Sequence, residues 1–348
     1  MPFHDAKDVV RSLSMAQLVN RNLQFSRSKG YLIIPLEREL LETELSKLKT
    51  QSTQSRVCEA DFLTSPSRPK NLQEACLGRL PSNVSLERLP RSYDIIGEIA
   101  VVEIEDELKP FSNIIGNGIL RLHPNMRLVV AKAAKTDGEY RTRKFEAIAG
   151  HGSMETIHHE FSCKFSLDLN LVYYNSRLSH ERMRIANQVA REEVVVDMFA
   201  GVGPYSILIA KTQPHAQVFS IDLNPAAYKY LMKNVFLNKV AERVSCHLGD
   251  AKRYALTSLR GIADRVIMNL PSNSSDYLDA ASSFLKPKGG VIHYYAFTPR
   301  NVEVETSSRV FQDILAKSGR RVESFTYQHV VKEVSPDRVQ IVLDAIIH

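Results

Sequence analysis

Three aspartates stand where apolar runs of the sequence end, and carboxylates in such places can bind a ligand. Asp197 ends the run EVVVD and precedes a glycine turn that contains Gly201 and Gly203. Asp222 ends the next apolar run, and Asp250 ends the one after it. Glycines at a strand-to-helix turn let the backbone approach a ligand, and parallel sheets bind ligands at the carboxyl ends of their strands. The three acids and the turn together predict a ligand site.

The character of this ligand follows from what surrounds the turn. The segment GVGPYS lacks the third glycine of the dinucleotide fingerprint. An acid immediately before the turn suits a ligand that carries an ammonium group and no pyrophosphate. Asp222 is placed to accept both ribose hydroxyls, and Asp250 is placed to meet an adenine amino group. S-adenosylmethionine has all three parts, so we expect it as the cofactor rather than a simple tight turn with no ligand.

A fourth apolar run ends in MNLPS, which contains Asn269 and Pro271. An asparagine amide and a rigid carbonyl beside the transferable methyl group can hydrogen-bond to a base that has left its stack. The alternative is a strand that ends at a proline, with Asn269 as the cap of the following helix. The segment alone does not separate these two interpretations.

Charged residues gather in the segment YYNSRLSHERMRI, which contains Glu181. A glutamate near the start of a helix is favourable through the helix dipole alone, so a solvated helix start is one interpretation. A base that removes a proton from the substrate is the other. Arg141 and Arg143 are two residues apart and share one face if they lie on a strand. That face would point toward the site, a phosphate or solvent.

The elements that must position these residues form an alternating pattern from residue 171 onward. Short Val- and Ile-rich runs alternate with helical stretches, which predicts βαβ units and a doubly wound, mostly parallel sheet. The strands are expected in EVVVDMFAG, AQVFSIDLN, RVSCHLGDA, DRVIMNLP and GGVIHYYAF. Two further β-rich runs, RRVESFTYQHVVKEV and DRVQIVLDAII, predict a hairpin at the edge of this sheet.

Two smaller α/β or α+β regions are expected before this Rossmann-like domain of residues 171–348. Residues 1–64 read as a small unit of helix, strand, helix and strand, in AKDVVRSLSMAQLVNRN, GYLIIPL, ERELLETELSKLK and VCEADFL. The segment TSPSRPKN is a candidate linker. Residues 65–170 then predict a strand, a helix, a strand and a hairpin, in IIGEIAVVEI, FSNIIGNGILRL, RLVVAKAA and ETIHHEFSCKFSLDL.

Composition limits the remaining function classes. The chain has 348 residues, a formal net charge of +6 and 44% hydrophobic residues, which is typical of a globular protein of two or three domains. The basic balance is compatible with RNA as a partner. The four cysteines are far apart and show no metal spacing, so no metal site is expected. No apolar run is long enough to cross a bilayer, and the N-terminus lacks a signal-like segment, so a cytoplasmic location is expected.

Several of these segments resemble one enzyme family. The runs VVVDMFAGVGPYSI, IDLNPAA, DRVIMNLP and GGVIHYY closely resemble the archaeal and eukaryotic tRNA (guanine-37-N1)-methyltransferases. The upstream runs GEYRTRKFEAIAG, TIHHE and SRLSHERMRIA resemble the same family in the same order. The resemblance implies a class I methyltransferase fold and methyl transfer from S-adenosylmethionine to N1 of guanosine 37 of tRNA. For residues 1–64 it implies a contact with the outer corner of tRNA. We expect the protein to be a monomer.

The resemblance also implies roles for individual residues. It makes Glu181 the general base, Arg141 the group that stabilises guanine O6, and Asn269 a residue of the base pocket. Together with the patterns above, it gives a predicted substrate-contacting group that consists of Arg141, Arg143, Arg182 and Pro271. The predicted cofactor-binding group consists of Tyr173, Arg177, Asp197, Phe199, Gly201, Gly203, Asp222, Leu223, Asp250, Ala251 and Asn269. The family has Asn-Pro-Arg where this chain has Asn175-Ser176-Arg177, which loosens the entry to the helix.

Three other functions compete with this one. A related transferase of the wybutosine pathway moves the aminocarboxypropyl group of the same cofactor to the same tRNA position. A nucleotide-dependent oxidoreductase would bind NAD in place of S-adenosylmethionine. A tRNA-binding protein with an inactive transferase domain would keep the fold and lose turnover. The segments ERMRI and NLP favour methyl transfer over the wybutosine-pathway reaction, and the intact acids and Glu181 count against an inactive domain.

Overall fold

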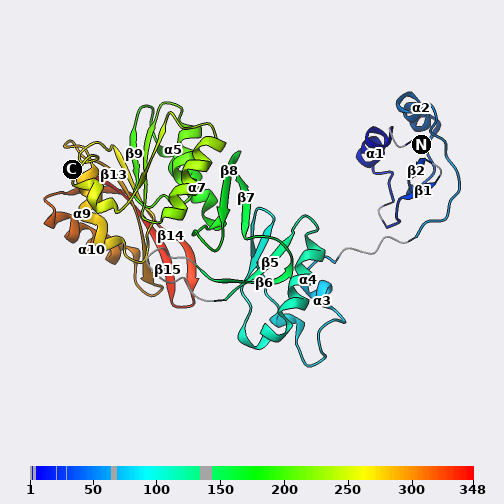
Figure 1. Cartoon of the computed structure of the whole chain (residues 1–348), viewed down its shortest axis with the longest axis horizontal. Helices are drawn as coiled ribbons and strands as arrows, with labels where there is room; N and C mark the ends of the chain where they lie inside the picture. The colour runs from blue at the N-terminus through cyan, green and yellow to red at the C-terminus, as the bar shows by residue number, and fades with distance from the viewer. Residues whose placement is uncertain (1, 3–4, 21, 29, 64–68, 134–142) are drawn as a thin grey trace. The chain divides into compact units, whose positions relative to one another are not determined.

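The computed structural model describes the whole chain except residues 1, 3–4, 21, 29, 64–68 and 134–142. It divides into two compact units, Met1–Lys70 and Asn71–His348 (Figure 1). In the part that is described, no helix is long and apolar enough to cross a membrane. Nor do the described histidine, cysteine and acidic side chains form a group of three or more that could hold a metal ion.

The first unit is built around a small apolar core. It contains α1 (Ala6–Met15), the antiparallel pair β1 (Ser26–Ser28) and β2 (Tyr31–Ile33), and α2 (Glu42–Gln51). Val9, Leu13 and Leu48 from the two helices are buried together in this core. The strand predicted in VCEADFL is wrong: residues 57–63 form no strand and are almost wholly exposed, because neither β1 nor β2 pairs with them.

The second unit begins with a four-stranded sheet in the order β3-β4-β5-β6. Its strands are β3 (Tyr93–Ile96), β4 (Ile99–Val102), β5 (Leu128–Lys132) and β6 (Phe145–Gly150), with α3 (Leu72–Cys76) and α4 (Ser112–Leu122) packed on it. The single strand predicted in IIGEIAVVEI is wrong, because Gly97 turns the chain with a φ of 58° and makes a hairpin of β3 and β4. A Cβ atom there would lie 2.1 Å from Thr156 Oγ1.

The predicted hairpin of ETIHHEFSCKFSLDL is confirmed as β7 (Glu155–Glu160) and β8 (Cys163–Asp168). Two asparagines of α7 (Pro225–Leu237) and its C-cap hold it. Asn234 accepts a hydrogen bond from Ser166 N at 2.7 Å and donates to Ser166 O at 3.0 Å. Asn238 makes the same pair of bonds with the backbone of Lys164. The hairpin is thereby fixed to the domain that follows.

The large sheet has seven strands in the order β11-β10-β9-β12-β13-β15-β14. The five that were predicted are parallel: β9 (Val194–Asp197), β10 (Gln217–Asp222), β11 (Val244–Leu248), β12 (Arg265–Met268) and β13 (Gly290–Pro299). The predicted edge hairpin is confirmed as β14 (Val322–Ser335) and β15 (Arg338–Ile347), both antiparallel to their neighbours. Four register shifts interrupt the pairing of β14 with β15.

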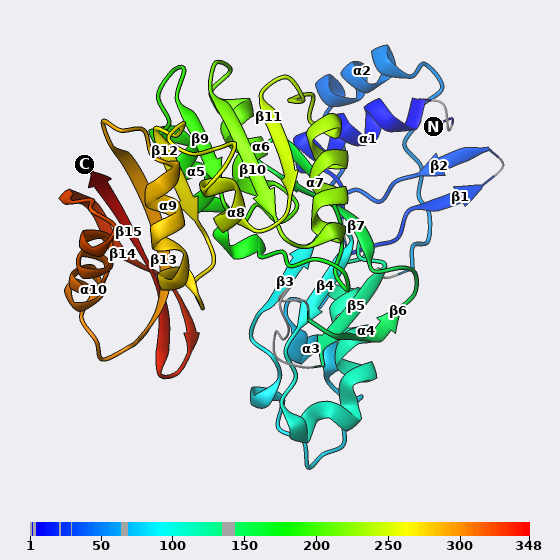
Figure 2. The same cartoon turned by 60° about the vertical axis from the view of Figure 1, so that its left-hand side comes forward.

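Helices cover both faces of this sheet, as a doubly wound fold requires (Figure 2). On one face lie α5 (Ser179–Gln188), α6 (Pro204–Thr212) and α7, which share a core with Val195 and Ile267. On the other face lie α8 (Ala251–Ala255), α9 (Leu278–Phe284) and α10 (Val304–Lys317), which share a core with Val196 and Met268. Neighbouring strand residues thus point to opposite layers. The predicted fold, a Rossmann-like doubly wound and mostly parallel sheet, is confirmed.

Candidate active site

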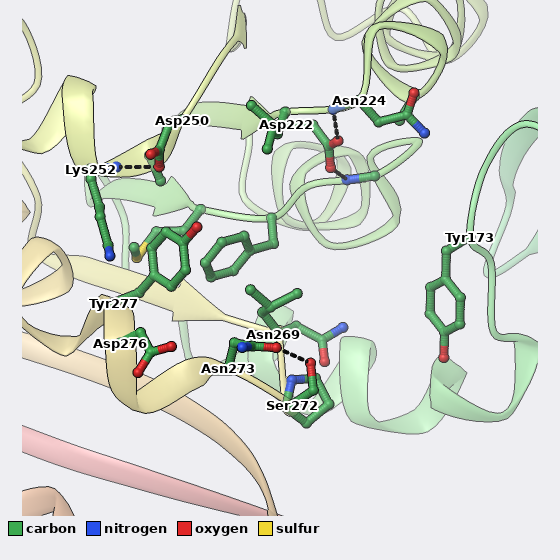
Figure 3. Close-up of a pocket in the computed structure, with 18 of the residues that line it drawn as sticks. Tyr173, Asp222, Asn224, Asp250, Lys252, Asn269, Ser272, Asn273, Asp276 and Tyr277 are labelled. Carbon is green, nitrogen blue, oxygen red and sulfur yellow. Dashed lines mark hydrogen bonds between the residues drawn. The ribbon is translucent and has the colours of Figure 1, made fainter. Parts of the chain in front are cut away.

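A pocket of about 620 Å³ opens at the carboxyl ends of β9, β10, β11 and β12 (Figure 3). In Figure 3, Asp250 and Lys252 lie on one side of it and Tyr173 lies on the other. The strand ends therefore meet at one pocket, at the place where the ligand site was predicted. The predicted residues that line it are Tyr173, Phe199, Gly201, Asp222, Leu223, Asp250, Ala251, Asn269 and Pro271.

Asp222 is held by the backbone on either side of it. Its Oδ2 accepts a hydrogen bond from Gly201 N at 2.6 Å, and its Oδ1 accepts one from Asn224 N at 2.9 Å. Burial raises the pKa of Asp222, and these two backbone donors oppose that rise. Each oxygen still has a lone pair for a ligand hydroxyl. Gly201 reaches its position with a φ of 56°, and a Cβ there would meet only Tyr173 O, at 3.9 Å.

The Asp250 side of the pocket contains residues that sequence patterns did not suggest. Asp250 accepts a hydrogen bond from Lys252 N at 3.0 Å and so caps α8. The Lys252 ammonium lies 4.5 Å from the ring centroid of Tyr277, and Phe199 meets the same ring edge-on at 5.0 Å. These rings give the pocket an apolar wall beside a carboxylate. Tyr277 follows the predicted Asn269 segment closely in sequence. It is far in sequence from Lys252, however, so no local pattern indicates that the two side chains meet.

Asp197 lies beneath the pocket lining and is fully buried. Its Oδ2 accepts a hydrogen bond from Ser206 Oγ at 2.7 Å, whereas its Oδ1 has no partner among the described residues. Burial raises the pKa of Asp197 to about 7. The predicted Gly203 also lies behind the pocket, at the N-cap of α6, where a Cβ atom would lie 2.6 Å from Leu231 Cδ1. Its role is to let α6 approach α7.

The Asn269–Pro271 edge of the pocket meets the C-terminal strands. Pro271 O accepts a hydrogen bond from Phe297 N on β13 at 3.0 Å. Phe297 is the register partner of Gln340 on β15, and both line the pocket. The Nε2 atom of Gln340 is buried without a hydrogen-bond partner in the described structure. A buried donor of this kind is satisfied when a ligand supplies an acceptor. Sequence patterns gave no signal for Phe297 or Gln340.

Glu181 lies in the first turn of α5, outside the group of described residues that line the pocket. Its Oε1 accepts hydrogen bonds from Arg184 Nη2 and from the hydroxyl of Tyr295, each at 2.6 Å. Its Oε2 accepts one bond, from Arg184 Nε at 2.9 Å. The side chain is 11% exposed. The carboxylate is therefore fixed in place and is not the solvated helix start of the alternative interpretation.

Two predicted arginines have other partners. Arg182 is 2% exposed and forms a buried ion pair with Glu160, with Nε donating to Oε1 at 2.8 Å. The structure thus gives Arg182 a buried contact with β7 in place of the predicted contact with RNA, because its guanidinium is covered. Arg177 Nε donates to Asp94 Oδ1 at 2.5 Å and is half-exposed, so it ties the start of α5 to β3 rather than lining the pocket.

The remaining substrate residues lie near the four-stranded sheet. Arg141 falls outside the described residues. Arg143, which precedes β6, is partly buried. Its charge is one of several near Lys332 on β14. Burial first, and then Arg177, Lys132 and Arg143, lower the pKa of Lys332 to about 8. Several cationic side chains therefore lie where β14 faces the smaller sheet, together with Asp94, which pairs with Arg177.

Family models match two parts of the chain. The model described as the TRM5/TYW2 methyltransferase domain matches residues 156–323. The model described as the TYW2 N-terminal domain matches residues 73–153. The two matches are adjacent and together include the α5 helix, the four-stranded sheet and all of the pocket lining except Gln340.

Full-length relatives show the same similarity. The chain is 36% identical over 344 residues to the tRNA (guanine(37)-N(1))-methyltransferase Trm5b of Pyrococcus abyssi, covering 99% of this chain and 97% of that protein. The complex structure of aTrm5 and tRNALeu matches with a TM-score of 0.72 and 27% identity, covering 100% of this chain and 98% of that one. The structure of M. jannaschii TYW2 in complex with AdoMet matches with a TM-score of 0.57 and 27% identity, covering 74% and 99%.

Proposed function

The chain belongs to the TRM5/TYW2 methyltransferase family, and on that premise we propose that it methylates N1 of guanosine 37 of tRNA, with S-adenosylmethionine as methyl donor. The observation that carries this proposal is the composition of the pocket. Asp222 and Asp250, which suit a ribose and an adenine, line the same space as Asn269 and Pro271, which suit a base edge. One pocket thus has room for the donor and for the atom that is methylated.

The residues of the pocket fit the cofactor by their chemistry. The free lone pairs of Asp222 accept ribose hydroxyls, and Asp250 faces the adenine amino group beside Phe199 and Tyr277. The unpartnered Oδ1 of Asp197 supports a role opposite the ammonium group, because a buried carboxyl gains a counter-charge there. S-adenosylmethionine supplies an electrophilic methyl carbon, whose bond to sulfur breaks as N1 attacks and leaves a neutral thioether.

The chain itself must deal with the proton and the charge of the guanine. N1 of guanine is protonated at neutral pH, so a base has to accept that proton as the new bond to carbon forms. We assign this role to Glu181. As the proton leaves, negative charge develops on O6, and a cationic donor lowers the energy of that state. We assign this role to Arg141. Asn269 and Pro271 hold the base after it has left its stack, with Arg143 close to its backbone.

The same family offers one alternative reaction. Residues 73–153 match a domain described by the name of the TYW2 proteins, and a transferase of the wybutosine pathway would move the aminocarboxypropyl group instead of the methyl group. The two reactions use the same cofactor and break different bonds to its sulfur. They therefore leave additions of different mass on the same nucleoside.

One experiment separates these outcomes. The protein is incubated with labelled S-adenosylmethionine and unmodified tRNA, and the tRNA is digested and its nucleosides are identified by mass. We expect N1-methylguanosine, mapped to position 37. An aminocarboxypropyl adduct would establish the alternative. Absence of any transfer, together with calorimetric binding of NAD, would instead support an oxidoreductase.

We also infer how the rest of the chain serves this reaction. The unit Met1–Lys70 would contact the outer corner of tRNA, away from the anticodon. The basic residues near Lys332 would meet phosphates of the anticodon loop. The enzyme would act as a monomer without a metal ion, in the cytoplasm, where its tRNA substrate is found.

A further inference from the structure

Arg184 lies between two carboxylates that come from distant parts of the chain. Its Nε and Nη2 donate to the two oxygens of Glu181 at 2.9 and 2.6 Å. Its Nη1 donates to Oδ2 of Asp344 on β15. The guanidinium also stacks on the ring of Tyr327 on β14, 4.1 Å from its centroid. One planar group thus holds the proposed base from α5 against the two C-terminal strands.

The two oxygens of Glu181 are not equivalent in this arrangement. Oε1 accepts two hydrogen bonds, one from Arg184 and one from Tyr295, and so both of its lone pairs are used. Oε2 accepts only the bond from Arg184 Nε among the interactions of the described residues. Oε2 is therefore the atom with a lone pair left for a proton.

The partners of Arg184 are themselves fixed. Arg265 can only donate, so its hydrogen bond at 2.7 Å makes Nε2 of His293 the acceptor. The proton of His293 is then on Nδ1, which donates to Asp344 Oδ1 at 2.6 Å. Burial lowers the pKa of His293, which keeps it neutral. Burial alone would raise the pKa of Asp344, but His293 and Arg184 hold it below its usual range. Asp344 is thus a buried negative charge that shares Arg184 with Glu181.

We propose that Arg184 is a positioning residue for methyl transfer: it orients Glu181 so that Oε2 receives the N1 proton, and it places beside that carboxylate a positive charge that Asp344 shares. This inference rests on the proposed role of Glu181 as the base. The guanidinium thus orients Glu181 with a charge that is divided between two carboxylates.

The groups that face Glu181 from every side decide the direction of each effect. On its own helix this group is Arg184. From β13 Tyr295 donates to it, and from α6 Tyr205 neighbours Tyr295, whose rings lie 6.3 Å apart. Burial raises the pKa of both tyrosines further above its ordinary value, so they stay uncharged at neutral pH. Arg184, with Asp344 behind it, is therefore the contact whose charge can be changed by substitution.

The test is the pH dependence of single-turnover methylation, measured with the full chain and saturating S-adenosylmethionine and tRNA. In Arg184→Met the carboxylate loses its counter-charge and is protonated more easily, so the acid limb of the profile should move up by roughly 1–3 pH units. In Arg184→Lys the positive charge remains, but the pair of parallel hydrogen bonds to the two oxygens of Glu181 is lost. The rate should fall, but the acid limb should stay near that of the unmodified protein.

Asp344→Asn should move the acid limb in the opposite direction. With Asp344 neutral, Arg184 acts on Glu181 alone, and the carboxylate stays ionised to lower pH. Arg320→Met is the matched control, because Arg320 donates to backbone carbonyls of residues 282–287 at the far edge of the domain. Its profile should match that of the unmodified protein. In Glu181→Gln most of the rate should be lost and the affinity for S-adenosylmethionine kept.

The results separate the proposal from its premise. Opposite shifts in Arg184→Met and Asp344→Asn establish the positioning role. Lower rates with the same midpoint in both variants would show that Arg184 only fastens α5 to β15, and this overturns the proposal. If Arg184→Met does not fold, a midpoint in Asp344→Asn equal to that of the unmodified protein overturns it equally. Failure of the unmodified protein to form N1-methylguanosine would refute the proposed function, and with it this role.

Discussion

At the scale of single residues, Asp197 is a buried acid whose protonation state we expect to be linked to ligand binding. It is fully buried, and its pKa is raised to about 7, whereas an unfolded chain releases this proton near pH 4. Between these values the folded protein holds a proton that the unfolded chain lacks. The contribution of Asp197 to the free energy of unfolding therefore decreases as the pH rises from about 4 to 7.

We predict that S-adenosylmethionine binding at pH 6 releases a proton, because the ammonium group favours the ionised form of Asp197. Calorimetric titrations in two buffers of different ionisation enthalpy measure this release directly. The apparent binding enthalpies should differ, and Asp197→Asn should remove the difference. Equal enthalpies in both buffers for the unmodified protein would show that the ammonium group binds elsewhere.

Residue patterns predicted part of the pocket for a clear physical reason. Asp222, Asp250 and Gly201 follow apolar strands, so their place at the sheet edge is a local property of the sequence. The contact of Arg184 with Asp344 spans 160 residues, and no local pattern contains it. The burial of Arg182 could not be predicted for the same reason. It depends on an ion pair with Glu160, which lies in a hairpin outside the helical segment that contains Arg182.

At the scale of elements, the attachment of the β7–β8 hairpin depends on Asn234. This side chain is fully buried, and besides its two bonds to Ser166 it donates to Val202 O at 3.0 Å. Removing it leaves three backbone groups without partners in a site that water does not reach. Each such group costs about 1–3 kcal/mol, partly offset by relaxation.

We predict that Asn234→Ala lowers the free energy of unfolding by about 2–4 kcal/mol, measured by denaturant titration. Asn117→Ala is the control, because Asn117 is exposed and bonds only to Asn113 within α4 among the described contacts. That change should cost less than about 0.5 kcal/mol. Similar losses in the two variants would mean that the Asn234 bonds contribute no more than a surface pair.

The elements themselves were predictable where one pattern dominated. Continuous Val and Ile runs gave the parallel strands, and alternating residues gave the β7–β8 and β14–β15 hairpins. The strand predicted at residues 57–63 failed because a strand needs a partner, and alternation cannot supply one. The run IIGEIAVVEI gave no indication of the turn at Gly97. A glycine is required there because Thr156, a residue far along the chain, approaches too closely for a Cβ atom.

At the scale of the whole molecule, the chain has two units with separate cores, and none of the described residues of the smaller one lines the pocket. If this unit contacts the outer corner of tRNA, substrate affinity depends on parts of the RNA beyond the anticodon arm. We predict that the full chain binds unmodified full-length tRNA more tightly than the isolated anticodon stem-loop, by tenfold or more as an order of magnitude.

Filter binding or fluorescence anisotropy at fixed salt measures this difference. A tRNA transcript with the same anticodon arm and a disrupted outer corner is the matched control, and it should bind like the stem-loop. Equal affinity for all three RNAs would restrict recognition to the unit that holds the pocket.

The four register shifts along β14 affect how readily the protein aggregates at high concentration. β14 is the last strand of the seven-stranded sheet, and Val330 and Val334 are exposed on it. A straight strand of this kind would present a row of free amide and carbonyl groups to any other chain. Repeated shifts bend that row out of line, and Lys332 and Glu333 place charge within it. The sheet therefore ends in an edge that resists strand-to-strand aggregation.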